Sequence, residues 1–127
     1  MELPSEPVVF FKAPSTVVGP YDDVLIPGAG TKPDWEVDLG VVIGSTARYL
    51  DDLDDARGVV AGYCVSRDVS ERHFQLEAAG SGSRQVVRDV QPAGPWLVTA
   101  DEVADPKGLS LHLSVTESCA RRARPRR

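Results

Sequence analysis

The sequence predicts a mainly β domain with short helices. Short apolar segments rich in β-branched residues recur along the chain between Gly and Pro residues, and the helical signals are only one or two turns long. The chain has 127 residues, of which 42% are hydrophobic and 26% are charged, so it is one ordinary globular domain. Because no long crossover helix is available, the sheet is expected to fold over or roll.

Six segments are expected to form strands, because each is apolar and is bounded by residues typical of turns. The clearest is the last, where Leu109, Leu111, Leu113 and Val115 alternate with polar residues and predict one wet face. The expected strands are residues 7–12, 24–26, 35–44, 59–65, 96–98 and 109–115.

Short helical turns are expected between these strands, at residues 51–57 and 99–102, with a turn at 105–108. A further helix is expected from Val69 to about Leu76. Asp68 would cap it, and Glu71 at the third helical position fits a capping box.

The charge is distributed unevenly along the chain. Five of the 14 basic residues are arginines in the last seven positions, which leaves nine basic and 19 acidic residues in the first 120. An acidic body does not suit nucleic acid, whose binding depends on Lys and Arg at phosphates, but it suits a hard cation. We therefore expect a domain over residues 1–117, a disordered basic tail over 118–127 and no nucleic-acid partner.

The sequence also favours a cytoplasmic protein with no membrane partner. No segment approaches the ~20 apolar residues that span a bilayer, and the acidic start is not a signal peptide. Cys64 and Cys119 form no disulfide framework and no CxxC pair, which is typical of a reducing compartment.

Three carboxylates are candidate metal ligands. Glu36 and Asp38 are one residue apart in an expected strand, so both side chains leave the same face. Their repulsion would be relieved by a divalent cation with oxygen ligands or by water on an exposed face, and the spacing leaves both open. Asp68 follows a buried strand, where it would be a ligand, a helix cap or both.

The histidines are interpreted as surface residues. Ser70 and His73 would face each other on the expected helix, but the sequence has no G-x-S-x-G elbow for a nucleophile. His112 lies on the polar face of the last strand. No catalytic residue is assigned from these patterns.

Four blocks of the sequence resemble, in order, conserved blocks of the fumarylacetoacetate hydrolase family, and the resemblance extends over about residues 3 to 115. The blocks are PVVFFKAPS at 7–15, DWEVDLGVVIG at 34–44, GYCVSRDVSERHFQ at 62–75 and GPWLVT at 94–99.

The resemblance implies a partial β roll of that family, in a homodimer, that acts on a small 2-oxo acid. Family members hydrolyse C–C bonds of diketo acids, decarboxylate oxaloacetate or isomerise 2-oxo-ene acids, with Mg²⁺ or Mn²⁺ stabilising an enolate as a Lewis acid. The resemblance places the metal ligands at Glu36, Asp38 and Asp68. It also matches Gln75 to the glutamine that contacts substrate and Arg72 to an arginine of the same block.

The chain also departs from the family pattern. The family's base histidine belongs to a stretch before residue 1, its active-site lysine aligns with Gln85, and the aspartate after that lysine aligns with Arg88. The composition changes abruptly after Glu117. We therefore expect a truncated reading frame, with frameshifts near 78–90 and after 117, and impaired turnover. The alternative is a non-catalytic metal-binding or pairing relic of the family.

Overall fold

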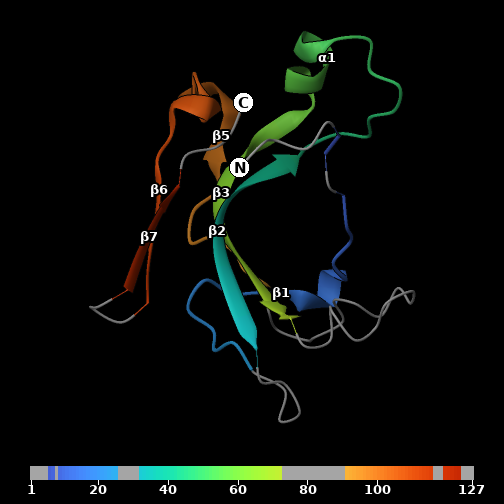
Figure 1. The fold of residues 1–127 in the computed structure, drawn as a ribbon. Coiled ribbons are helices and arrows are strands. Elements are labelled where there is room, and N and C mark those ends of the chain that lie inside the picture. The colour runs from blue at the N-terminus through green and yellow to red at the C-terminus, as the bar shows by residue number, and fades with distance from the viewer. Residues whose placement is uncertain (1–5, 8, 26–31, 73–90, 116–118, 124–127) are drawn as a thin grey trace.

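The computed structural model describes residues 6–7, 9–25, 32–72, 91–115 and 119–123. Its centre is a long, curved, antiparallel ribbon of two strands, β2 (Pro33–Ile43) and β3 (Val60–Glu71) (Figure 1). A short strand, β5 (Val98–Thr99), pairs with the other edge of β3 to make a three-stranded sheet. The prediction of a mainly β fold with short helices is confirmed.

The ribbon turns through a short helix, α1 (Leu53–Gly58). Asp52 caps this helix, because its Oδ1 accepts hydrogen bonds from the backbone N–H groups of Asp54 and Asp55 at 2.8 and 2.9 Å. Next to α1, the register of the β2–β3 pairing shifts between Val42 and Ile43. This irregularity lies at the α1 end and leaves the register of the opposite half regular.

Two small sheets flank the ribbon. β1 (Val17–Val18) follows the 3₁₀ helix η1 (Pro14–Thr16) and pairs in parallel with β4 (Gln91–Pro92). β6 (Leu111–Val115) pairs antiparallel with β7 (Cys119–Ala123). The 3₁₀ helices η2 (Ala100–Glu102) and η3 (Pro106–Gly108) lie between β5 and β6.

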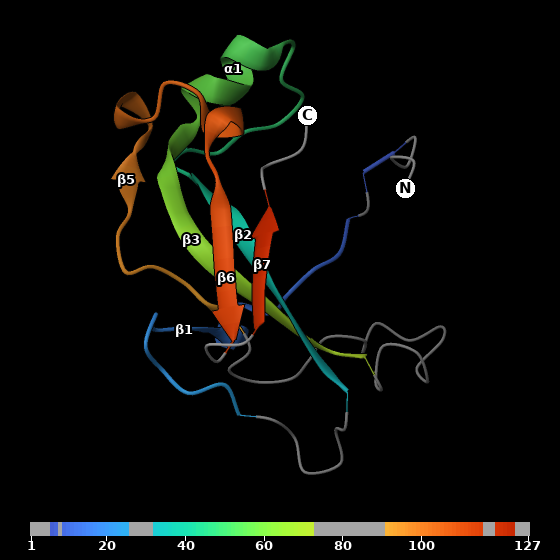
Figure 2. The same cartoon turned by 60° about the vertical axis from the view of Figure 1, so that its left-hand side comes forward.

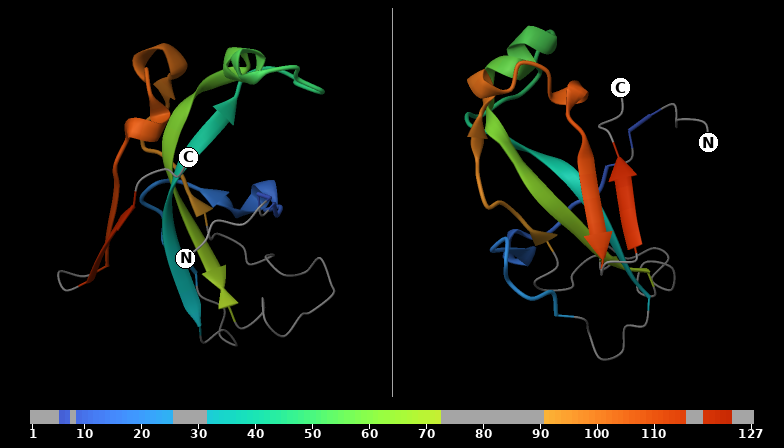
Figure 3. Two further views of the ribbon diagram at one scale, coloured as in Figure 1. Left: turned by 45° about the horizontal axis from the view of Figure 1, so that its top comes forward. Right: turned by 90° about the vertical axis from the view of Figure 1, so that its left-hand side faces the viewer.

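The two small sheets lie on opposite sides of the ribbon. The ribbon separates the N-terminal segment (residues 6–7 and 9–13) and β1 from β6 and β7 in the first view, and the turned views agree (Figures 1, 2 and 3). Because side chains alternate along a strand, the ribbon has two chemically different faces. One carries Trp35, Val37 and Leu39 and belongs to the side of β6, whose Leu113 is buried.

Several predicted elements are confirmed. The strands expected at 35–44, 59–65 and 109–115 correspond to β2, β3 and β6, and the expected turns at 51–57, 99–102 and 105–108 correspond to α1, η2 and η3. The strand expected at 96–98 is displaced to β5 at Val98–Thr99.

The helix expected from Val69 does not begin there, because β3 continues through Glu71, and of its described part only Arg72 is helical. The pairing with β2 runs to Pro33 opposite Glu71, and the Arg72 N–H still donates to the Lys32 carbonyl at 2.9 Å. A partner strand satisfies these backbone groups more completely than one capped turn would, so tertiary pairing overrides the local capping signal. Asp68 is therefore a strand residue and not a helix cap.

The first two expected strands are also wrong in their described parts. Residues 7 and 9–12 form no strand, because this segment meets β3 through the side chain of Lys12 and not through a backbone ladder. Val24 and Leu25 are likewise not in a strand. Apolar composition alone does not supply the neighbouring backbone that a strand needs.

The expected disordered tail needs correction at residues 119–123, which form β7 beside β6. Backbone hydrogen bonds to a neighbouring strand do not require apolar side chains, so a basic segment close in sequence can complete the edge of β6. Within the described residues, no helix has the length and apolar character needed to cross a membrane.

Candidate metal centre

The candidate ligands lie together on the second face of the ribbon. Glu36 on β2 is directly opposite Asp68 on β3, and Asp38 is opposite Ser66. Directly opposed residues of an antiparallel pair share a face, and so do residues two apart on one strand. Glu36, Asp38 and Asp68 therefore project from the same patch, on the side of the N-terminal segment.

The three carboxylates are close enough to affect one another electrostatically. The pKa of Asp38 is raised from its ordinary value by partial burial, and further by the negative charges of Asp68 and Glu36. Lys12 acts in the opposite direction on the same group. The arrangement therefore concentrates negative charge at Asp38, which disfavours its ionised form.

Lys12 reaches this patch from the N-terminal segment. Its ammonium donates a hydrogen bond to Asp68 Oδ1, as an ion pair, and another to the Val69 carbonyl at 3.1 Å. The side chains of Lys12 and Asp68 are only 10% and 14% exposed. Water therefore screens this pair little, and each charge depends on the other.

Arg72 holds the neighbouring carboxylates. Its Nε and Nη2 donate to Asp34 Oδ2 at 3.1 and 2.9 Å, and Nη2 also donates to Glu36 Oε1 at 2.9 Å. The pKa of Arg72 is raised, chiefly by the hydrogen bond to Asp34. Arg72, which the resemblance assigns to a substrate-contacting block, is thus bound to two carboxylates in this structure.

The donor set suits a hard divalent cation, because it offers carboxylate oxygens from two rigid strands. Within the described ranges, however, no three His, Cys, Asp or Glu side chains converge so that they could hold a metal ion. Asp68 is instead paired with Lys12, and Glu36 with Arg72. The residues fit a metal in chemistry, and their side chains would have to reorient to bind it.

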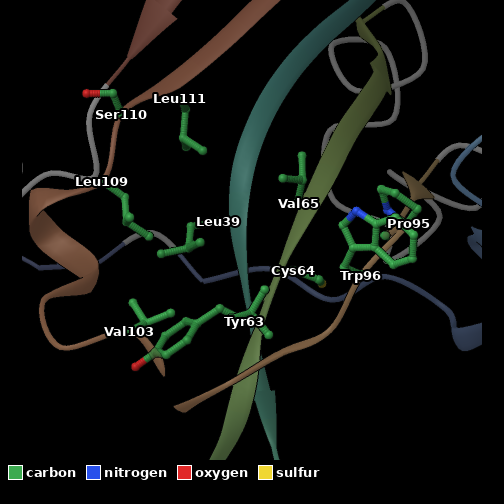
Figure 4. Close-up of a pocket in the computed structure, with 12 residues that line it drawn as sticks. Leu39, Tyr63, Cys64, Val65, Pro95, Trp96, Val103, Leu109, Ser110 and Leu111 are labelled. Atoms are coloured by element: carbon green, nitrogen blue, oxygen red, sulfur yellow. The ribbon is translucent and has the colours of Figure 1, made fainter. Parts of the chain in front are cut away.

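A separate apolar pocket of about 390 Å³ lies on the opposite face of the ribbon. Leu39 of β2 points toward Leu109 and Leu111, while the ring of Tyr63 reaches toward Val103 (Figure 4). These side chains offer no charged group, so this pocket is not where carboxylate chemistry would occur.

Other residues singled out from the sequence lie elsewhere. Gln75, His73, Gln85 and Arg88 are outside the described residues. Ser70 lies on β3 opposite Asp34, and not on a helix that would face His73. His112 is exposed on β6, as its alternating strand predicts.

Sequence reasoning missed Lys12 and Asp34 as partners of the carboxylate patch. A usable signal was present at Lys12, since it ends an apolar run and lysine is rarely buried without a partner. The partner is Asp68, 56 residues further along the chain, and the local sequence pattern could not predict it.

Comparison with known proteins agrees on one family. The sequence model described as "Fumarylacetoacetate (FAA) hydrolase C-terminal" matches residues 1–125. The chain is 52% identical over 118 residues to a Burkholderia ambifaria protein named "Putative hydrolase", an alignment that includes 91% of this chain and 41% of that protein.

Solved structures give the same result. Maleylpyruvate hydrolase from Sphingobium sp. SYK-6, solved with manganese(II) and pyruvate, is 32% identical with a TM-score of 0.73, over 87% of this chain and 39% of that one. The 2-hydroxyhepta-2,4-diene-1,7-dioate isomerase from Mycobacterium marinum is 30% identical with a TM-score of 0.68, over 82% and 40%. The chain thus spans about two fifths of the length of these relatives.

Proposed function

Because the chain belongs to the fumarylacetoacetate hydrolase family, we propose that its carboxylate patch binds Mg²⁺ or Mn²⁺ and serves chemistry on a small 2-oxo acid. The observation that carries this proposal is the direct opposition of Glu36 and Asp68, with Asp38 on the same face. These three residues would hold the cation through oxygen atoms.

A bound divalent cation would supply Lewis-acid polarisation of the substrate's oxygen atoms. The chain's own residues would supply the rigid two-stranded platform and the charge that retains the cation. The similar Sphingobium hydrolase, solved with manganese(II) and pyruvate, supports both the metal and a 2-oxo acid as the ligand class.

We further propose that turnover by this chain is about 10² to 10⁴-fold slower than with a positioned acid–base group, because no histidine among the described residues lies beside the carboxylate patch. His112 lies on β6, on the other side of the ribbon from the carboxylates. Lys12 is engaged with Asp68, and Gln85 carries no charge where the family resemblance places a lysine. The ion-paired state of the patch also favours a second candidate function, a non-catalytic metal-binding or pairing module of the same family.

Metal binding is tested by titrating Mn²⁺ into the full chain, followed by calorimetry and by electron paramagnetic resonance. We expect Glu36→Gln and Asp68→Asn to weaken Mn²⁺ binding at least tenfold. Asp51→Asn removes an exposed carboxylate outside the patch and should leave the affinity unchanged. Equal affinities in all four proteins would refute the patch as the metal site.

Turnover is tested with oxaloacetate and acylpyruvates in the presence of Mg²⁺ or Mn²⁺. We expect rates well below about 1 s⁻¹, the lower end for enzymes. A faster, metal-dependent rate that Glu36→Gln abolishes would contradict the weak-turnover proposal and the non-catalytic alternative, while supporting the metal site.

We also propose that the chain forms a homodimer in the cytoplasm. The support is an unusual amount of exposed apolar surface in the described part, including Phe11 at 90% and Trp96 at 75% exposed, which favours association. Analytical ultracentrifugation would show a dimer, and a monomer at micromolar concentration would contradict this. Cell fractionation tests the compartment.

A further inference from the structure

Asp68 already binds one cation in this structure, the ammonium of Lys12. It is held by two acceptors, Asp68 Oδ1 and the Val69 carbonyl, and it is almost fully buried. An ammonium and a metal ion are both cations that seek the carboxylate oxygen, so on this oxygen they compete.

The two cations of the patch are anchored differently. Arg72 makes two hydrogen bonds to Asp34 in addition to its bond with Glu36, so it stays in place if Glu36 turns to another partner. Among the described residues, the other acceptor of Lys12 is the Val69 carbonyl, which is a neutral group. Loss of the Asp68 contact would therefore release Lys12 more readily than loss of Glu36 would release Arg72.

Charge balance points the same way. The patch combines four carboxylates with two cations: Asp34, Glu36, Asp38 and Asp68 with Lys12 and Arg72. The two excess negative charges attract a divalent ion. Once that ion approaches Asp68, however, the buried ammonium beside it is strongly repelled because little water screens the two positive charges.

We propose that Lys12 is an internal counter-ion, which holds Asp68 when no metal is bound and which a divalent cation must displace to bind. This inference rests on the proposed metal site and extends it to a residue outside the carboxylate set. Lys12 would thereby lower the metal affinity, and in the metal-free protein it would neutralise Asp68, whose charge otherwise acts on Asp38.

The first test compares Mn²⁺ affinity in the full chain, Lys12→Met and Lys107→Met. Methionine keeps most of the apolar stem of lysine but removes the charge, and Lys107 is an exposed lysine on η3 that serves as the matched control. We expect Lys12→Met to bind Mn²⁺ about tenfold more tightly, or about 1.4 kcal/mol, and Lys107→Met to bind like the unmodified chain.

An unchanged or weaker affinity of a folded Lys12→Met protein would overturn the displacement proposal, although the metal site would stand. No Mn²⁺ binding by either the unmodified chain or this variant would overturn both. Binding by the variant alone would support the proposal most strongly.

The second test needs no variant and therefore does not depend on the folding of Lys12→Met. The unmodified chain is treated with an amine-acylating reagent with and without saturating Mn²⁺, and the modification of each lysine is measured by mass spectrometry. We expect Mn²⁺ to raise the rate at Lys12 several-fold and to leave Lys107 unchanged. Equal rates at Lys12 in both states, with Mn²⁺ bound, would overturn the proposal.

Discussion

Glu36 and Asp68 lie directly opposite each other on β2 and β3, and each is paired with a different cation. Like charges at opposed positions of an antiparallel pair destabilise a sheet. Here Arg72 neutralises Glu36, and Lys12 neutralises Asp68. The repulsion that a metal would relieve is thus relieved by side chains from two other parts of the chain.

Arg72, which binds both Asp34 and Glu36, is expected to stabilise the end of the β2–β3 ribbon that lies away from α1. Arg72→Met should lower the free energy of unfolding by about 1–2 kcal/mol, because it removes charge-assisted hydrogen bonds to partly buried Asp34 and to Glu36. Chemical denaturation in a chelating buffer measures the change.

Arg57→Met is the matched control for the Arg72 variant. The Arg57–Asp54 pair is 76% and 88% exposed, so its loss should cost less than about 0.5 kcal/mol. Equal losses in the two variants would show that Arg72 acts only as another surface cation.

Asp38 is expected to make stability fall with rising pH. Its pKa is raised in the folded protein by burial and by the Asp68 and Glu36 charges, so the folded state holds this proton more tightly than the unfolded state does. This stabilising contribution is full below the ordinary value of 3.8 and is lost as the pH rises through the folded-state pKa.

The measurement for Asp38 is the melting temperature of the unmodified chain and Asp38→Asn between about pH 3.5 and 7 in a chelating buffer. The melting temperature of the variant should rise progressively above that of the unmodified chain as the pH increases. At neutral pH the difference should correspond to a free energy of unfolding on the order of 0.5 kcal/mol. A difference that stays constant with pH would contradict the coupling among these carboxylates.

Gly62 is expected to tolerate no side chain. A Cβ at this position would collide with the Val98 carbonyl where β5 pairs with β3, so Gly62→Ala should cost about 2–4 kcal/mol. Gly58→Ala, with open space around it at the end of α1, should be neutral or slightly stabilising. Similar melting temperatures for the two variants would refute the close approach of β5.

Leu113 is expected to anchor β6 against the ribbon. Leu113→Ala should cost about 2–3 kcal/mol, because the side chain is only 9% exposed and its removal leaves a cavity. Leu53→Ala, on α1 and 74% exposed, should change stability by less than about 0.5 kcal/mol. Comparable losses would mean that β6 is not packed as described.

Much of the fold was predictable because its longest elements carry local signals. The apolar and β-branched residues of β2 and the alternation of β6 identify strands without any partner. The helix predicted after Asp68 was wrong because the capping signal of Asp68 and Glu71 is local. The pairing with β2 that overrides this signal involves a distant part of the chain. Residues 9–12 gave the opposite error: their apolar character predicts a strand, but no backbone in the described part of the chain forms a ladder with them.

The strand pattern around Glu36 and Asp38 is enough to place both side chains on one face, since residues two apart in a strand lie on the same side. The position of Asp68 opposite Glu36 follows only from the folded chain, because register depends on the pairing of distant segments. It also decided that Lys12 and Arg72 hold these carboxylates. An ion pair needs two charges brought within a few ångströms, and spacing along the chain carries no information about an approach between segments so far apart in sequence.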